Sequence, residues 1–586
     1  MKRKTKFSKL DVYHRVLLFV FLFVFLFSCI LLPNANGASL EGAIHVRNEV
    51  ELRNAVNNAP SNVPVAIIFD ASITLTNTLY IPVGKLITLT CNDPVNSYLL
   101  VGTNNQSTIT VVGGGGLTLD GIVVTHNAGV SGSGVTVHFG GTLILSNGTI
   151  SGNTAARGGG VYNAGFFKMI GGEISNNIAD PYQGGGVYNE YGSFEMFGGK
   201  LSSNTALHGG GVYNYFGSFR MSGNCMVWGN TAEYGGGVYT DRGNFSLTGG
   251  NIFDNVAKNQ GGGVYNTFGF FEMFNGQISG NTALYGGGGV TNVGVFSLFG
   301  GAILGNSANH YGGGLYNFFG KLLVNGVDAY GGNFSLSGGE IFGNSASSGG
   351  GVYSVDGHFT MSGGLISNNT AVFDGGGVYN EFSVDSSGNL IYSFCDFRLS
   401  GGKIFGNIAS RNGGGVGVSH VAGLARIFVA DGVVFSNNYA AAAYNRDSIH
   451  DSLYSSNVGN RVTWTQPFTQ GYNNYDISYA IGASIDIGNN TVLDSGNNNS
   501  NCGSGSNSTN SSDKSNNEFS LGNDAGFGLN GGIFNTGGMW SGLFSYTALV
   551  GAALVVVIVV LCFVAVFLFQ KVRAVGSGKN EAPVNG

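Results

Sequence analysis

The chain has 586 residues, of which only 10% are charged, and its formal net charge is −6. This balance offers no basic face to a nucleic acid or to an anionic lipid surface. The six cysteines are scattered without a Cys-x-x-Cys pair, which argues against a disulfide framework and against a cysteine metal site. The histidines form no cluster in the sequence. We therefore expect no metal, no cofactor and no nucleic-acid partner.

The N-terminus has the order of a secretory signal peptide. Basic residues between Lys2 and Arg15 precede an apolar run from Val16 to Leu32, and Pro33 with small residues near Gly37 follows. We expect a signal peptide over residues 1–37. The apolar run is also long enough to remain as an uncleaved anchor, so the sequence leaves both outcomes open.

Residues 38–144 read as an N-terminal cap and the first coils of a β fold. A short strand over 43–46 precedes an amphipathic segment over 51–56, and strand patterns follow at 65–69, 73–75 and 85–90. A helix at this place can cover the open end of a stack of strands, where unpaired edges and apolar core are otherwise exposed.

Residues 145–440 carry ten copies of a Gly-Gly-Gly-aliphatic motif, and most successive copies lie 25 or 26 residues apart. A unit of that length cannot bury its own apolar side, so the copies must stack on one another as a solenoid. The copies begin at Gly158, Gly184, Gly209, Gly235, Gly261, Gly287, Gly312, Gly349, Gly375 and Gly413.

Two more patterns recur between the glycine runs. A Phe-x-(Met/Leu) element, as in Phe167 to Met169, has the period of a strand whose Phe and Met point inward. An aliphatic-x-x-Asn element, as in Ile174 to Asn177, places an Asn at a turn, where stacked copies can form a ladder of amide hydrogen bonds. No copy contains a helix-length amphipathic segment. The prediction is an all-β fold, a right-handed parallel β-helix.

The repeat resembles a known family of surface proteins. The segment Ile341-Phe-Gly-Asn344-Ser-Ala-Ser-Ser-Gly-Gly-Gly-Val352-Tyr353 looks like the GGA(I/L/V) and FxxN repeats of polymorphic outer-membrane proteins, adhesins with a β-helical passenger. The start of the chain is similar to that of pectate-lyase-like β-helix domains. This chain has Gly where the adhesins have Ala, mostly Ile before the x-x-Asn, and no C-terminal β-barrel translocator. The resemblance implies the fold and display at a surface.

The C-terminal part predicts display on a membrane. Irregular last coils are expected over 441–488, and a stalk rich in Asn, Ser and Gly over 489–541. A transmembrane helix is expected over 542–570, because residues 548–569 are uncharged, and a cytoplasmic tail over 571–586 begins with Lys571. The chain would then be a single-pass cell-membrane protein with an extracellular ectodomain. The stalk sequons at Asn489, Asn498, Asn507 and Asn510 are candidates for glycosylation.

A column of tyrosines directly after the glycine runs is the first candidate binding feature. If the preceding aliphatic residues point inward, alternation turns the tyrosine rings outward as an aromatic stripe. Such a stripe can bind sugars, or it can serve only to stack the strands. The column consists of Tyr162, Tyr188, Tyr213, Tyr239, Tyr265, Tyr316, Tyr353 and Tyr379, interrupted by Thr291.

Two insertions are the second candidate. The spacing from the first Gly of a run to the inward Phe is 9 or 10 residues in most copies, but 22 from Gly312 to Phe334 and from Gly375 to Phe397. Both insertions of about 12 residues enter at the same turn, two rungs apart, where solenoids often bind a ligand. Tolerated surface variation is the alternative. The candidate ligand-binding residues are Lys321, Leu322, Leu323, Tyr330, Leu390, Ile391, Tyr392 and Phe394, together with Tyr316, Tyr353 and Tyr379.

Three functions remain open at this point. The preferred one is an adhesin-like protein that binds a glycan or another surface. The second is a structural surface protein without a dedicated ligand, and the third is a polysaccharide lyase or hydrolase. Catalysis needs carboxylates close together, whereas Glu190, Asp241 and Glu381 fall in one column with other residues between them. We therefore expect no catalytic residues and no enzyme activity.

Overall fold

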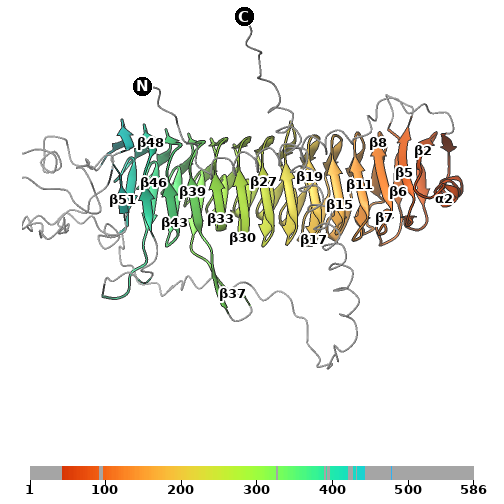
Figure 1. Ribbon diagram of the computed structural model, residues 1–586, viewed down its shortest axis with the longest axis horizontal. Helices are drawn as coiled ribbons and strands as arrows, with labels where there is room; N and C mark the ends of the chain where they lie inside the picture. Colours follow the sequence, from red (N-terminus) through yellow and green to blue (C-terminus); the bar gives the residue numbers. More distant parts are fainter. Residues whose placement is uncertain are drawn as a thin grey trace, which may run out of the picture. The chain divides into compact units, whose positions relative to one another are not determined.

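The structure is a computed structural model, and it describes residues 43–91, 97–324, 327–387, 391, 396–419, 427–430, 432–441 and 477. These residues form a parallel β-solenoid in which each coil lies on the one before it (Figure 1). One sheet has 26 strands, a second has 14 and a third has 11. The prediction of an all-β, parallel solenoid built from the repeat is confirmed.

The 26-stranded sheet contains two parallel rows of strands, because each coil crosses it twice. We call the row that contains the tyrosine column the tyrosine row. Its strands are β4 (Leu79–Ile81), β7 (Ile109–Val111), β10 (Val135–Val137), β14 (Val161–Asn163), β18 (Val187–Glu190), β22 (Val212–Tyr215), β26 (Val238–Asp241), the first halves of β30 (Val264–Met273) and β33 (Val290–Leu298), β36 (Leu315–Phe318), β42 (Val352–Val355), β46 (Val378–Glu381) and β50 (Val416–Val418).

The second row contains the inward phenylalanines and is called the phenylalanine row. It continues each coil after a short bend, the inter-row bend. Its strands are β1 (Ile44–Val46), β2 (Pro64–Phe69), β5 (Leu86–Cys91), β8 (Gly116–Asp120), β11 (Thr142–Leu145), β15 (Phe166–Met169), β19 (Ser193–Met196), β23 (Ser218–Met221), β27 (Asn244–Leu247), the second halves of β30 and β33, β39 (Asn333–Leu336), β43 (His358–Met361), β47 (Phe397–Leu399) and β51 (Ile427–Val429).

The two smaller sheets close the coil. The 14-stranded sheet contains β3 (Ile73–Leu75), β6 (Leu99–Gly102), β9 (Val123–His126), β12 (Thr149–Ser151), β16 (Glu173–Ser175), β20 (Lys200–Ser202), β24 (Met226–Trp228), β28 (Asn251–Phe253), β31 (Gln277–Ser279), β34 (Ala302–Leu304), β40 (Glu340–Phe342), β44 (Leu365–Ser367), β48 (Gly402–Phe405) and β52 (Val433–Ser436). The 11-stranded sheet contains β13 (Thr154–Arg157), β17 (Ile178–Gln183), β21 (Thr205–His208), β25 (Thr231–Tyr234), β29 (Val256–Gln260), β32 (Thr282–Ala283), β35 (Ser307–Ala308), β41 (Ser345–Ala346), β45 (Thr370–Ala371), β49 (Ile408–Ala409) and β53 (Tyr439–Ala440).

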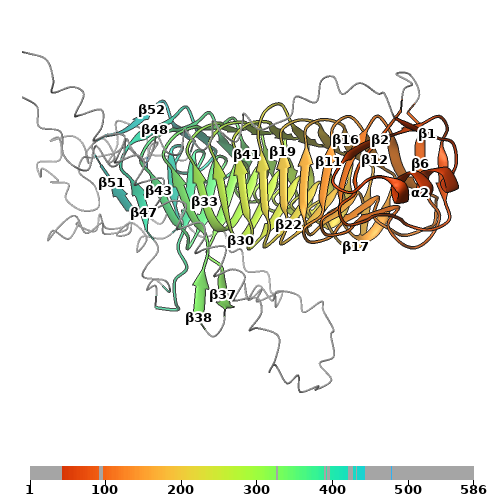
Figure 2. The same cartoon turned by 45° about the vertical axis from the view of Figure 1, so that its right-hand side comes forward.

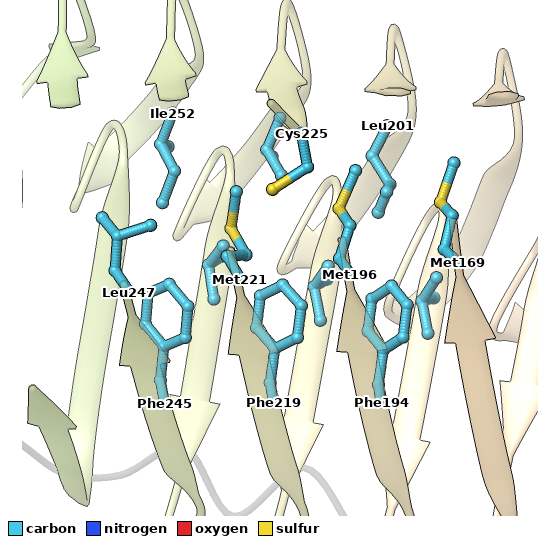
Figure 3. Packing of buried hydrophobic residues seen from close by; sticks show 14 of the residues in the cluster. Met169, Phe194, Met196, Leu201, Phe219, Met221, Cys225, Phe245, Leu247 and Ile252 are labelled. Atoms are coloured by element: carbon cyan, nitrogen blue, oxygen red, sulfur yellow. The ribbon is translucent and has the colours of Figure 1, made fainter. Parts of the chain in front are cut away.

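The phenylalanine column is the centre of the core, as the period-two pattern predicts. The nine rings from Phe167 to Phe397 are all at most 2% exposed. Neighbouring rings lie with centroids 4.5 to 5.1 Å apart, as for Phe271 and Phe296 at 4.5 Å, and all pairs are stacked except Phe359 with Phe397, which meet edge-on. Figure 3 shows Phe194, Phe219 and Phe245 side by side on adjacent strands with the Met and Leu side chains beside them. The buried Cys225 points into the same core, and burial raises the pKa of its thiol to about 11.

The predicted amide ladder is present at the turn between the 14-stranded and 11-stranded sheets. Each Asn side chain donates through Nδ2 to Oδ1 of the Asn on the next coil, as from Asn255 to Asn281 at 3.0 Å. The same Oδ1 accepts the backbone N–H of the preceding Asn, and Asn255 Nδ2 also donates to the Val227 carbonyl oxygen at 2.9 Å. The ladder members are Asn153, Asn177, Asn204, Asn230, Asn255, Asn281, Asn306, Asn344, Asn369, Asn407 and Asn438.

The glycine runs are required by two different constraints. Gly235 has a φ of +65°, in the left-handed region that favours glycine. Gly236 has no such φ, but a Cβ on it would lie 2.6 Å from the carbonyl oxygen of Gly262 on the next coil. The absence of a Cβ in these runs therefore allows the backbones of adjacent coils to lie in direct contact.

A helix lies near the first coil, as the sequence predicts. Helix α2 (Glu49–Asn58) begins after Asn48, whose side chain accepts the N–H of Glu51 at 3.0 Å. Leu52, Ala55 and Val56 are buried and belong to the same core cluster as the strands. Helix α2 contacts β1 and β3, and Figure 2 shows it at the same end of the solenoid as β1.

Several predicted regions lie outside the described residues. These are the signal peptide (1–37), most of the C-terminal coils (441–488), the stalk (489–541), the membrane span (542–570) and the tail (571–586). Ile477 is an exception, because it is buried and pairs with Val416 of β50. None of the helices among the described residues has the length and apolar character needed to span a bilayer.

Candidate functional site

The inter-row bend carries bulky side chains on a backbone that does not suit them. Tyr191, Phe216, Arg242 and Phe268 occupy successive bends with φ between +49° and +55°. A left-handed backbone costs a residue with a Cβ about 1–2 kcal/mol, and Gly or Asn is the usual choice. The turn before the 11-stranded sheet mostly follows that rule, since its left-handed residues are chiefly Gly and Asn, as at Asn176 and Asn368, although Ser203 is an exception. Strain of this kind often marks a functional surface.

Three of these side chains, those of Tyr191, Phe216 and Arg242, form one stacked, exposed group. The rings of Tyr191 and Phe216 are nearly parallel, with centroids 5.4 Å apart, and Tyr215 contacts both rings edge-on. The Arg242 guanidinium lies over the Phe216 ring, 5.4 Å from its centroid. Tyr191 is 66% exposed and Phe216 is 42% exposed. The sequence analysis missed this group, although its repetition at the same distance after each glycine run is visible in the sequence.

Both insertions leave the solenoid at this same bend, as predicted. The first forms an antiparallel hairpin of β37 (Lys321–Val324) and β38 (Val327–Tyr330), in which Lys321 pairs with Tyr330 and Leu322 with Ala329. Figures 1 and 2 show the hairpin and the second insertion projecting from the same side of the sheets. One coil, β42 with β43, separates them, because β36 pairs with β42 and β42 pairs with β46.

The candidate residues on the insertions are placed only in part. Leu323 pairs through its backbone with Asp328 within the hairpin. In the second insertion, Ile391 is 54% exposed and its N–H donates to the carbonyl oxygen of Ser383 at 2.9 Å. Leu390, Tyr392 and Phe394 lie outside the described residues, and so do Asn489, Asn498, Asn507 and Asn510.

Two carboxyl groups lie at the base of the second insertion. Asp356, in the inter-row bend of the coil between the insertions, accepts the N–H of Ser383 at 2.8 Å and also its hydroxyl. Burial raises the pKa of Asp356, and the Ser383 hydrogen bonds offset part of that effect. Burial also raises the pKa of Glu381, the charge of Asp356 adds to the increase, and a hydrogen bond donated by the Tyr353 hydroxyl opposes it. The second insertion is therefore attached to a partly buried acidic pair.

The tyrosine column stacks as predicted but is not an exposed stripe. Tyr213 and Tyr239 stack at 5.0 Å and Tyr239 and Tyr265 at 4.8 Å, with Thr291 interrupting the column. Tyr188, Tyr213, Tyr265, Tyr316 and Tyr353 are only 3 to 8% exposed, and Tyr162, Tyr239 and Tyr379 are half-buried. Two flanking columns of side chains cover the rings. One column lies directly before the glycine runs and includes His208 and Tyr311. The other lies at the ends of the tyrosine-row strands and includes Tyr215 and Asp241.

The middle of the tyrosine column contains buried polar groups with incomplete hydrogen bonding. The ring of His208 contacts those of Tyr213, Tyr234 and Tyr239, and burial lowers the pKa of His208 to about 4. Asp241 accepts a hydrogen bond from the Tyr213 hydroxyl at 3.1 Å. Burial raises the pKa of Asp241, and the positive charge of Arg242 offsets part of that increase. Neither His208 Nδ1 nor Asp241 Oδ1 has a hydrogen-bond partner among the described residues.

The outward charged columns follow the predicted register. Lys168 pairs with Glu195 and Glu195 with Arg220 on adjacent strands. The acids Glu190 and Asp241 share a column with Tyr215 between them. Within the part of the chain that the structure describes, no three His, Cys, Asp or Glu side chains are grouped closely enough to hold a metal ion.

Comparison with known proteins identifies no relative. No protein-family model, no curated protein and no solved structure matches this chain. The likeness to polymorphic outer-membrane proteins therefore rests on the repeat motifs alone, and the likeness to pectate-lyase-like domains on the parallel solenoid.

Proposed function

We propose that this chain is an adhesin-like surface protein that attaches to a glycan or to another surface through the inter-row bend. The observation that carries the proposal is that both insertions emerge from that bend, with one coil between them in the stack. Insertions confined to one edge of a solenoid commonly form its binding face. The strained, exposed aromatic residues along the same bend add support. Backbone strain and exposed apolar surface both lower the stability of the fold, and a role in binding would explain their presence.

The proposal includes a location and a finer architecture. The solenoid winds right-handed, α2 covers its N-terminal end, and a signal peptide over 1–37 directs export. A stalk over 489–541 and a single span over 542–570 then hold the ectodomain outside the cell. The support is in the sequence: the basic start with its apolar run, the uncharged segment 548–569, and the basic residues Lys571 and Arg573 that follow it.

Removal of both insertions tests the binding face. The hairpin can be excised cleanly, because the Gly331 N–H donates to the Gly320 carbonyl oxygen at 2.8 Å across its base. In the second insertion the cut falls directly after Ser383, whose N–H and hydroxyl group both donate to Asp356. Deletion of 321–330 and 384–395 should leave the thermal transition nearly unchanged, since the stacked coils remain intact. Attachment of displaying cells to their target surface should fall. Unchanged attachment would favour a structural protein whose insertions bind nothing.

A polysaccharide hydrolase is the second candidate, and the pair Asp356 and Glu381 favours it. Glycoside cleavage uses two carboxyl groups, one of which keeps its proton near neutral pH because its pKa is raised. Burial and the neighbouring Asp356 raise the pKa of Glu381 in this way. The test is release of reducing ends from polysaccharides by the purified protein. Activity that Glu381→Gln abolishes would replace the adhesin proposal, and absence of activity would remove this candidate.

A further inference from the structure

Two coils have an inter-row bend that is shorter than the others. The spacing from the first Gly of the run to the inward Phe is 9 residues in the coils of Gly158 and Gly287, against 10 in the other coils without an insertion. In the first of these coils, only Ala164 and Gly165 separate Asn163 from Phe166. The residue that has a left-handed φ in other coils is missing there. This bend contains two residues, against four in the preceding coil and three in the following coil, and we call the recess that this shortening implies the notch.

Exposed aromatic rings surround this notch. Phe139 lies in the bend of the preceding coil and is 88% exposed. Tyr191 lies in the bend of the following coil and is 66% exposed. Phe166, at the end of the notch, is 58% exposed. These are the three most exposed aromatic residues of the described core sheets and bends, and they gather at one place.

One face of the Tyr191 ring is directed toward the notch. Its other face is stacked on Phe216, which belongs to the coil beyond it. The coil on the near side presents only Ala164 and Gly165 at this position, so no ring covers that face from the neighbouring coil. The second short bend differs, because Val293 there is 5% exposed and lies under Gly320 at the neck of the hairpin. The hairpin of the next coil thus covers one short bend, whereas neither coil next to the bend at Ala164 carries an insertion.

The width of the notch limits what it can hold. The bends of Phe139 and Tyr191 are two coil spacings apart, which is about 10 Å. A ring in van der Waals contact with an aromatic face on each side needs about 7–8 Å between those faces. An α-helix with its side chains is about 10–12 Å in diameter and would not enter. The spacing of the two bends is therefore wide enough for a flat ring and too narrow for a helix.

The backbone of the bend is also closed to an added strand. The N–H of Ala164 donates to Val137 at 2.8 Å and that of Phe166 donates to Gly141 at 2.9 Å. The carbonyl oxygen of Gly165 accepts Ser193 N–H at 2.9 Å, and Gly165 N–H donates to Asn163 Oδ1 at 3.2 Å. These groups are already paired with the neighbouring coils. An extended peptide would find no hydrogen-bonding edge here.

We infer that this notch binds one ring of a neutral oligosaccharide between Tyr191 and Phe139. The apolar faces of a pyranose ring match aromatic faces, and its hydroxyl groups need polar partners at the rim. His138 is exposed at the rim, and the Glu190 carboxylate, which accepts the Tyr162 hydroxyl, lies beside Tyr191. That carboxylate would repel an acidic sugar, which favours a neutral one. The site is separate from the two insertions, so this inference does not depend on whether the insertions bind a ligand.

The test measures binding of neutral tetrasaccharides of glucose and xylose to the purified full-length protein, by ligand-observed NMR and calorimetry. At least one should bind, and an acidic galacturonate tetrasaccharide should bind more weakly. Tyr191→Asn should reduce the affinity about tenfold while the thermal transition stays or rises, because Asn suits the left-handed backbone. Ala164→Tyr should abolish binding by filling the notch.

Matched controls show whether the notch itself is responsible for the binding. Phe299→Ala removes a 45% exposed ring that stacks on Phe274 away from this bend, and it should leave the affinity unchanged. The variant without both insertions should keep its affinity for the tetrasaccharide even if cell attachment is lost. Failure of every neutral tetrasaccharide to bind, or binding that survives both Tyr191→Asn and Ala164→Tyr, would overturn the inference.

Discussion

At the scale of single residues, this solenoid depends on buried amides. A second Asn ladder, which the sequence analysis did not foresee, follows the ends of the tyrosine-row strands. Asn163 donates to Asn189 at 2.7 Å and Asn189 donates to Asn214 at 2.7 Å, and all three are fully buried. An Asn side chain has both a donor and an acceptor, so identical copies can satisfy one another at every coil. A residue without both groups breaks the ladder.

Thr240 is such a break. It takes the ladder position between Asn214 and Asn266, and its hydroxyl and Asn266 Oδ1 are both buried without a hydrogen-bond partner among the described residues. Thr240→Asn should accept from Asn214 and donate to Asn266, at about 0.5–1.5 kcal/mol for each hydrogen bond. We predict an increase of about 1–3 kcal/mol in the free energy of unfolding, measured by denaturant titration. The neighbouring coils hold Asn at this position, so the side chain fits.

Thr240→Val is the matched control, because it removes the unpaired hydroxyl and leaves Asn266 Oδ1 without a donor. Its stability should stay below that of Thr240→Asn. An equal gain from both variants would show that the missing ladder contact has no energetic role.

A pH dependence follows from Asp241. Burial raises the pKa of Asp241 in the folded state above its ordinary value of 3.8. The stabilising contribution of the protonated form is therefore complete below pH 3.8 and is lost as the pH rises through the folded-state pKa. Asp241→Asn keeps an acceptor for the Tyr213 hydroxyl and removes the buried charge. At pH 7 this variant should melt at a higher temperature than the parent, and the difference should shrink toward pH 4.

The comparison must be made between variants at each pH, because His208 acts in the opposite direction. Burial lowers the pKa of His208 to about 4, so its contribution is present above pH 6.5 and is lost as the pH falls. Glu272→Gln, on the exposed side of β30, makes the same change in net charge and serves as the control. A difference between Asp241→Asn and the parent that does not vary with pH would contradict the assignment.

At the scale of elements, the alternation along β30 separates core from surface. Phe271 is fully buried between the rings of Phe245 at 4.7 Å and Phe296 at 4.5 Å, whereas the next residue, Glu272, is exposed. Phe271→Ala should lower the free energy of unfolding by about 3–5 kcal/mol. Glu272→Ala should change it by less than about 1 kcal/mol. Denaturant titration of both variants checks this, and similar losses would mean that the faces are assigned wrongly.

The strand positions were predictable because the same residue pattern recurs in many copies of the repeat. Nine copies of Phe-x-(Met/Leu) fix which side of the strand is inward, and the unequal spacing at Gly312 and Gly375 locates both insertions. The covered state of the tyrosine rings was not predictable. It depends on columns that are distant in the sequence, such as those of His208 and Asp241, and only the register of the coils brings these beside the rings.

The candidate site was predictable to a similar extent. The spacing of 9 residues in the coils of Gly158 and Gly287 can be read from the sequence. Whether such a short bend is covered or exposed depends on the side chains of the adjacent coils. Phe139 and Tyr191 are 52 residues apart and become neighbours of one notch only after β10, β14 and β18 stack in register. Local patterns predict which residues point outward, whereas stacking decides which outward residues meet.

At the scale of the whole molecule, a solenoid of this kind distributes its stability over nearest-neighbour contacts. Each coil rests only on the coils before and after it, so local loosening spreads to adjacent coils first. The proposed binding features lie on successive coils of one bend, from Phe139 to the second insertion. Such an arrangement allows a long ligand or a surface to contact several sites along the stack, where linked weak contacts add up to firm attachment.

The orientation of the chain in a membrane is the last prediction. The uncharged segment 548–569 is followed by Lys571 and Arg573, and basic residues next to a span remain on the cytoplasmic side. Protease added to intact cells that display the full chain should remove the solenoid and leave a short fragment carrying an epitope placed after Val572. Permeabilised cells are the control, in which the epitope should also be digested. Protection of residues 158–438 together with loss of the epitope on intact cells would reverse the proposed orientation, and the inter-row bend would then face no external surface.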